Sequence, residues 1–355
     1  MCIFALVLCV PLAIPYILMM ANKQLGKVFG AFAAYVAFTV YLYQPYIGSF
    51  GRWQYLLLIN PPLASLGCFV LSRRWVESFA GSFFAGAIYG FGPFMLGLTR
   101  FHPTAGFLAA TIPWLFCPAA FICKTKWSWK EAALSLLPFL AIIVFFQATV
   151  HYHLFAVPRQ ARLHPADLFA LMAPLVSVRR GLNLTGFYHI PLAAIVMGFS
   201  MLLAARRLGI MILLLSGIVL AFCKPFLDVS PIIWFAVPAV CCSVITAGGI
   251  QGLVLSGFAD RKLVLAIAIF MGGLAIVTLL LATKYFQVFA GLASGYARVL
   301  TDTGKLFILG ALVTATIFFM TRLKVRILWV RRLILCSSMA VDIFLGARFI
   351  VDWIT

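Results

Sequence analysis

The sequence predicts an all-α fold, a polytopic bundle of about 12 transmembrane helices, and three observations support this. Of the 355 residues, 65% are hydrophobic and 10% are charged, whereas soluble domains have roughly 45–50% and about 25%. The mean hydropathy is +1.11. The apolar runs continue over about 20 residues, the length with which a helix crosses the hydrocarbon. These features exclude a soluble enzyme, a disordered chain and a secreted disulfide scaffold, and they disfavour an outer-membrane barrel, whose strands alternate apolar and polar residues.

The expected spans follow one another along the whole chain and form a single membrane domain, residues 1–355. They are 2–20, 26–43, 54–71, 78–98, 104–123, 132–150, 187–205, 208–223, 231–256, 262–283, 304–321 and 331–351. The short run at 208–223 suggests a tilted or partly buried helix. The last span is the least regular, because it contains Asp342 and Arg348. No internal repeat, low-complexity tract or soluble domain interrupts the series.

The charge distribution predicts the orientation of these helices. Lys and Arg total 27 against 8 acids, a net charge of +19. They lie in short loops, mostly those after the odd-numbered spans, and basic loops stay in the cytoplasm. We therefore expect a bacterial inner membrane protein with both termini outside and no nucleic-acid partner. The long outside loops at 151–186 and 284–303 are expected to contain interfacial helices along the membrane surface.

Three features stand out between residues 44 and 121: the step LSRR (71–74), the Gly/Phe-rich helix with YGFGPF (89–94), and a turn with His102-Pro103 before a helix with Pro113-Trp114. In these features the stretch resembles the YfhO-like membrane proteins of the GT-C glycosyltransferase superfamily. Two later helices also look similar, GFYHIPLAAIVMGFSMLLAARR (186–207) and PIIWFAVPAVCCSVITAGGIQGL (231–253). In the second, Trp234 and Ala239 replace the basic residues of the family pattern.

This resemblance implies an enzyme that moves a sugar from a polyprenyl-phosphate lipid to an acceptor on the outer face. Such families use an Asp or Glu in the first outside loop. The first outside loop of this chain, 44–53, contains no acid. The resemblance therefore implies either a shortened relative or one that has lost catalysis.

Few acidic residues are placed for chemistry. Asp167 and Asp302 are weak catalytic candidates, since they are expected outside but belong to no carboxylate pair. Asp342 lies inside the last apolar run, where a bare carboxylate is expensive. Arg348 does not share the helix face of Asp342, so it is not a same-face partner. Asp342 therefore has three interpretations: an intramembrane functional site, a residue paired with another helix, or part of a last segment that does not span the membrane.

Four arginines in the 151–186 loop form a candidate lipid-phosphate site, because guanidinium groups bind phosphate in a bidentate manner. They are Arg159, Arg162, Arg179 and Arg180, and contact with anionic lipid headgroups is the simpler interpretation. The five histidines and nine cysteines lack ligand spacings, so no metal and no cofactor is expected.

Three functions remain open. The first is a non-catalytic accessory or structural subunit of a membrane complex on a GT-C-like scaffold, with other membrane subunits and lipids as partners. The second is an active lipid-linked glycosyltransferase using a polyprenyl-phosphate donor. The third, a lipid or solute transporter, ranks last because the sequence shows no repeat and only Asp342 as a buried charge.

Overall fold

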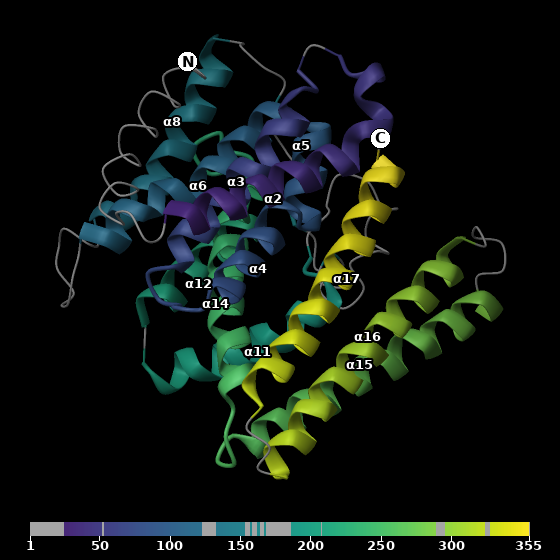
Figure 1. Cartoon of the computed structure of the whole chain (residues 1–355). Helices are drawn as coiled ribbons and strands as arrows, with labels where there is room; N and C mark the ends of the chain where they lie inside the picture. The colour runs from purple at the N-terminus through teal and green to yellow at the C-terminus, as the bar shows by residue number, and fades with distance from the viewer. Residues whose placement is uncertain are drawn as a thin grey trace.

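The computed structural model describes residues 25–51, 53–122, 133–152, 157, 162–163, 167, 186–206, 208–288, 295–323 and 327–354. Within these ranges the regular secondary structure is helical, apart from one isolated bridge between Phe226 and Val229. Apolar side chains cover most helix surfaces, so the described part of the chain is an all-α bundle of an integral membrane protein (Figure 1).

The helices follow the chain in this order: α2 (Leu25–Tyr43), the 3₁₀ helix η1 (Gln44–Ser49), α3 (Leu56–Ser72), α4 (Phe79–Gly90), α5 (Pro93–Phe101), α6 (Pro103–Ile122), α8 (Leu137–Tyr152), α11 (His189–Ala204), α12 (Leu208–Phe222), α13 (Pro231–Trp234), α14 (Ala236–Leu255), α15 (Arg261–Val288), α16 (Gly295–Arg322) and α17 (Leu328–Ile354).

Every predicted span from 26–43 onward falls on a helix or a helix pair, and the first, 2–20, lies outside the described residues. Seven stretches in the described part of the chain are long and apolar enough to cross a membrane: α2 with η1, α4 with α5, α6, α13 with α14, α15, α16 and α17. The apolar helices α3, α8, α11 and α12 are shorter than 18 residues.

The helix boundaries differ from the predicted spans in two regions of the chain. The predicted span 78–98 divides into α4 and α5, because Pro93 has no N–H to continue the hydrogen bonds of α4 and instead starts α5. The predicted loop 284–303 is shorter than expected, since α15 continues to Val288 and α16 begins at Gly295. In α15 and α16 the apolar run is shorter than the helix, because the backbone hydrogen bonds continue into the polar residues beside it.

Helix α14 lies at the centre of the bundle, and most of its side chains are buried. It packs against α11, α4 and α12. The contact with α11 is close because both helices use glycine there: a side chain at Gly198 would meet the carbonyl of Ile245, and one at Gly249 would meet that of Ala194. Small residues at such crossings let membrane helices approach closely.

The N-terminal helices α2 to α6 pack around α3, and buried polar groups connect them. Asn60 donates to the carbonyl oxygen of Pro103 (3.0 Å), which joins α3 to the start of α6. Trp114 on α6 donates to the carbonyl oxygen of Leu63 (3.1 Å). Both hydrogen bonds therefore connect α3 with α6.

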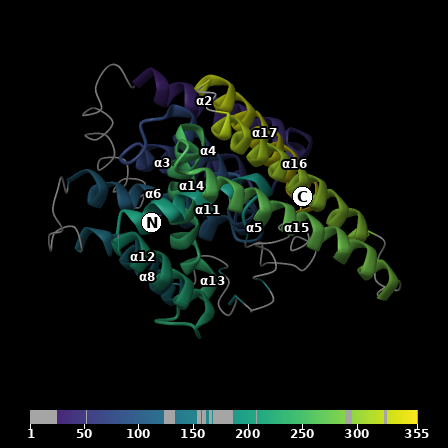
Figure 2. The ribbon, with the colours of Figure 1, turned by 90° about the horizontal axis from the view of Figure 1, so that it is seen from below.

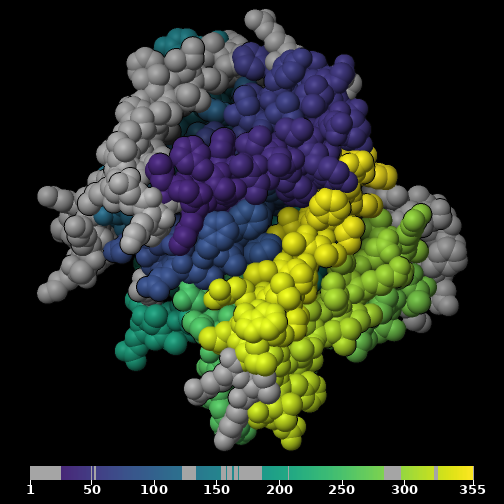
Figure 3. Space-filling view, in the orientation of Figure 1, coloured from purple at the N-terminus to yellow at the C-terminus, as the bar shows by residue number. Residues whose placement is uncertain are grey.

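Helices α15 and α16 form a long antiparallel hairpin that projects from the rest of the bundle in both ribbon views (Figures 1 and 2). Helix α17 runs back between this hairpin and the N-terminal helices. Figure 3 shows α17, in yellow, against α2, in purple, on one face of the molecule. Phe344 of α17 packs there on Phe38 (5.9 Å between ring centroids) and Tyr41 (5.5 Å).

The contacts sort the helix ends into two groups. At one end Arg74 donates to the Ala120 carbonyl oxygen, and Arg331 donates to that of Ser256. At the other end Arg100 donates to the Ile354 carbonyl oxygen. We name the first group the basic end, because its loops and helix termini carry Lys27, Arg73, Arg74, Arg206, Arg261, Lys262, Arg322, Arg331 and Arg332. These contacts bring together the ends of α3 and α6, the end of α14 and the start of α17, and the ends of α5 and α17.

Candidate functional site

The candidate site is built around Asp342, which lies in the middle of α17. Its side chain is fully buried. Asp342 precedes the last residue of α17, Ile354, by 12 positions, about 18 Å along a helix. An ionisable group at this depth is costly unless another group compensates it.

The compensating group is His189 of α11, also fully buried. Its Nδ1 atom lies 2.9 Å from Oδ1 of Asp342. The second carboxylate oxygen, Oδ2, accepts a hydrogen bond from the backbone N–H of Ile190 (2.6 Å). Asp342 thus interacts with a side chain and a main-chain group of α11 at the same time.

The position of the pair follows from where α11 begins. His189 is the first residue of α11, and Tyr188 before it is extended. The first N–H groups of a helix have no partner within the helix and carry partial positive charge. The carboxylate of Asp342 accepts one of these N–H groups, so it stabilises the start of α11 within the bundle.

The other ring nitrogen of His189, Nε2, is buried and has no hydrogen-bond partner among the described residues. Phe307 of α16 packs edge-on to the imidazole, with 4.9 Å between the ring centroids and an interplanar angle of 82°. The Phe307 ring thus keeps other polar groups away from this side of the pair. The imidazole therefore has one nitrogen directed at a carboxylate and one available for a further proton or ligand.

Tyr188 links the pair to a second helix break. Its hydroxyl donates to the carbonyl oxygen of Phe91 (2.5 Å), at the junction between α4 and α5. The phenol is buried and lies within electrostatic range of Asp342 and Tyr43. The start of α11 and the break between α4 and α5 therefore meet beside the His189–Asp342 pair.

A histidine hydrogen-bonded to a carboxylate is suited to proton transfer. The carboxylate fixes the ring orientation and stabilises the imidazolium, so the second nitrogen is able to accept and release a proton. Because the site lies within the bundle, a proton bound there would add a charge in a low-dielectric region. Within the described residues no three His, Cys, Asp or Glu side chains gather as metal ligands.

The other candidates, from the two segments predicted to be outside loops, do not gather at this site. Asp302 of α16 is bound to Lys305 (2.9 Å), with both side chains largely exposed. Asp167, one of the few described residues of the 151–186 segment, is half-buried. Arg162 is exposed, next to the Leu163 amide that donates to the Ala221 carbonyl oxygen. The other three arginines of the proposed phosphate site, Arg159, Arg179 and Arg180, lie outside the described residues.

Sequence reasoning did not single out His189, the partner of Asp342. The available signal was that His189 and Asp342 are ionisable residues inside two expected spans, 187–205 and 331–351. Arg348, six residues after Asp342, instead binds Asp352 (2.7 Å) at the end of α17. The pairing itself depends on how α11 and α17 cross, which a single sequence does not encode in its periodicity.

Comparisons with protein-family models, with curated proteins and with solved structures give no match to this chain.

Proposed function

We propose that this protein is a proton-coupled membrane transporter in which His189 and Asp342 form the protonation site. The observation that carries the proposal is the fully buried pair, with Nδ1 and Oδ1 2.9 Å apart, in the middle of a long membrane helix. Ionisable residues at such depth are rare and commonly belong to proton or substrate pathways. In each cycle the pair takes up one proton from one side and releases it to the other.

The helix geometry at the pair supports this proposal. Transporters bind substrates and ions where discontinuous helices meet near the membrane midplane, with a helix N-terminus facing an anionic group. Here the N-terminus of α11 faces the carboxylate of Asp342, and the junction of α4 and α5 is linked through Tyr188. Tyr188, the buried residue directly before His189, supplies a further titratable group beside the pair.

The proposal includes the finer topology that the sequence predicts. It assigns 12 spans, an inner-membrane location, a cytoplasmic basic end, and both termini outside. The pairing of the ends of α3 and α6, of α5 and α17, and of the α14 end with the α17 start supports this assignment. The GT-C relationship and sugar transfer through Asp302 or Asp167 stay predictions, tested by assaying sugar transfer from polyprenyl-phosphate donors with Asn at either position.

A second candidate function, an accessory subunit of a membrane complex, is favoured by the projecting hairpin. Helices α15 and α16 expose large apolar side chains such as Ile269, Ile276 and Leu312. Such a surface suits a neighbouring membrane subunit as well as lipid. The mass of the complex extracted in mild detergent tests this reading, and a monomer without a stable partner would count against it.

The test of the transporter proposal is charge movement after a pH jump, measured on proteoliposomes attached to a solid-supported membrane. A proton that reaches Asp342 crosses part of the membrane field, so the wild-type protein should give a transient current. We expect Asp342→Asn to abolish the current. Asp352→Asn is the matched control, since it makes the same change in the same helix at an exposed site, and it should keep the current.

Two outcomes would overturn the proposal: no current from the folded wild-type protein, or an unchanged current from Asp342→Asn. Gel filtration and circular dichroism establish that each variant is folded. Should Asp342→Asn fail to fold, His189→Gln replaces it, because glutamine keeps a hydrogen-bonding group toward the carboxylate but does not titrate. An unchanged current from His189→Gln then has the same meaning.

A further inference from the structure

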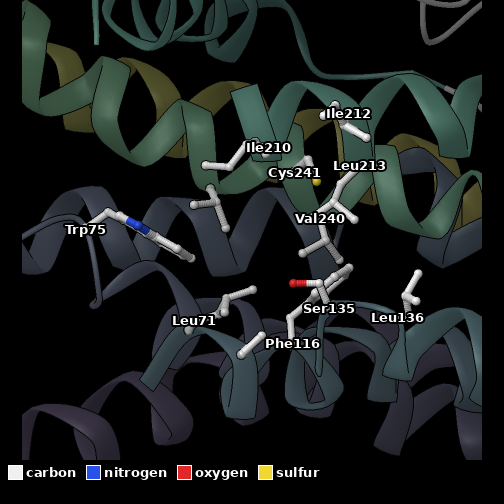
Figure 4. Close-up of a pocket in the computed structure, with 14 residues that line it drawn as sticks. Leu71, Trp75, Phe116, Ser135, Leu136, Ile210, Ile212, Leu213, Val240 and Cys241 are labelled. Carbon is white, nitrogen blue, oxygen red and sulfur yellow. The ribbon is translucent and has the colours of Figure 1, made fainter. Parts of the chain in front are cut away.

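An apolar cavity of about 420 Å³ lies toward the basic end of the bundle, away from the His189–Asp342 pair. It is lined by α3, α6, α12, α14 and the residues just before α8. Figure 4 shows Leu71 and Phe116 facing Ile210, Leu213 and Val240 across the open space. Its volume falls within the range of about 300–1,000 Å³ typical of ligand pockets.

The cavity opens to the outside of the bundle between α8 and α12. Leu136 and Ile212 both line it and are 55% and 64% exposed. Trp75, also in the lining, is partly exposed, and an indole is well suited to the boundary between lipid tails and headgroups. The opening therefore faces the side of the helix bundle, where membrane lipid surrounds it.

Two arginines, which follow the ends of α3 and α11, lie within a few positions of lining residues in the sequence. Arg74 directly precedes Trp75 and donates from Nε to the carbonyl oxygen of Ala120, another lining residue (2.9 Å). Arg206 precedes the lining residue Gly209 by three positions, and its left-handed backbone (φ 50°) ends α11. Both side chains are exposed. An apolar interior beside exposed guanidinium groups suits a molecule with a long hydrocarbon tail and an anionic head.

We propose that this cavity binds one acyl chain of an anionic phospholipid, with the phosphate at Arg74 and Arg206. The proposal is independent of proton transport. Water is a poor occupant because an apolar cavity offers it few hydrogen bonds, and an empty cavity would forfeit dispersion contacts. A peptide helix, about 10 Å wide with its side chains, is too bulky for this volume. Charge complementarity then selects an anionic lipid over a zwitterionic one.

Native mass spectrometry of the purified protein tests the proposal with two probes, phosphatidylglycerol and phosphatidylcholine with identical acyl chains. We expect one phosphatidylglycerol molecule to be retained in preference to phosphatidylcholine. Arg206→Gln should weaken phosphatidylglycerol binding by about fivefold, the effect of one basic group near a membrane surface. Arg322→Gln is the matched control, an exposed arginine at the same end on α16, and should bind as the wild type does.

A second pair of variants separates the tail from the headgroup. Val240→Phe places a larger side chain in the cavity and should displace both lipids, whereas Val277→Phe, at an exposed position of α15, should displace neither. Equal retention of the two lipids by the wild type, or unchanged binding by folded Arg206→Gln or Val240→Phe, would overturn the proposal. Retention of a different lipid class in place of phosphatidylglycerol would overturn it as well.

Discussion

At the scale of single residues, the pair of His189 and Asp342 combines two energetic roles. The carboxylate accepts hydrogen bonds from a ring nitrogen and from the Ile190 amide. Removing one partner of a buried pair leaves an uncompensated charge, which costs more than the intact pair contributes. The intact pair is therefore needed for stability. A variant of the pair can lose activity because it loses stability, so the two effects have to be measured separately.

A double-mutant cycle makes this separation. His189→Leu leaves the carboxylate without its main partner, and we expect it to lower the free energy of unfolding by about 3–5 kcal/mol. The double variant His189→Leu/Asp342→Asn should recover part of that loss, because the amide oxygen still accepts from Ile190 and no charge remains. Unfolding in mixed micelles measures both values. A double variant less stable than His189→Leu alone would contradict this account.

At the scale of elements, the entry into α11 depends on how closely α17 approaches it. Tyr188 packs where α17 has Gly346, and a Cβ atom at that position would collide with the tyrosine ring. The same ring is held by the hydrogen bond from its hydroxyl to Phe91. The glycine therefore determines the separation of two helices whose crossing brings His189 to Asp342.

Gly346→Ala should push α17 from Tyr188 and destabilise the protein by about 1–3 kcal/mol, the usual range for an overpacked core. Gly248→Ala is the matched control in α14, because a Cβ atom there meets nothing within 4 Å. The control should be neutral or stabilising by about 0.5–1 kcal/mol, since alanine favours the helix. Thermal unfolding followed by tryptophan fluorescence compares them, and equal melting temperatures would exclude the proposed contact.

At the scale of the whole molecule, the two groups of helix ends should lie on opposite sides of a membrane. Cys223 is exposed just after α12, on the side opposite the basic end, and Gly257 lies between α14 and α15 at the basic end. Basic loops are retained in the cytoplasm. The proposed orientation therefore predicts that Cys223 is outside and Gly257 is inside.

Labelling with a membrane-impermeant maleimide checks this topology in a variant whose other cysteines are replaced by alanine. Cys223 should react in intact cells. In a Cys223→Ala background, the Gly257→Cys variant should react only after the membrane is permeabilised. The reversed pattern would invert the predicted orientation, and labelling of both positions in intact cells would contradict a crossing between them.

The sequence by itself determined the class of the molecule and the place of most helices. Long apolar runs need no partner to be recognised, because each satisfies its own backbone hydrogen bonds in lipid. The predicted spans from 26–43 onward therefore fall on helices. It also identified Asp342 as an ionisable residue within the last span, since the cost of a charge in an apolar run depends on local sequence alone.

Only the tertiary structure decided what surrounds Asp342. His189 is 153 positions away in the sequence, and nothing in the apolar period of either helix relates the two. The cavity between α3, α6, α12 and α14 likewise depends on how helices cross. These features arise because side-chain packing and the hydrogen bonds of buried polar groups join different segments of the chain. Hydropathy, by contrast, is a property of a single segment.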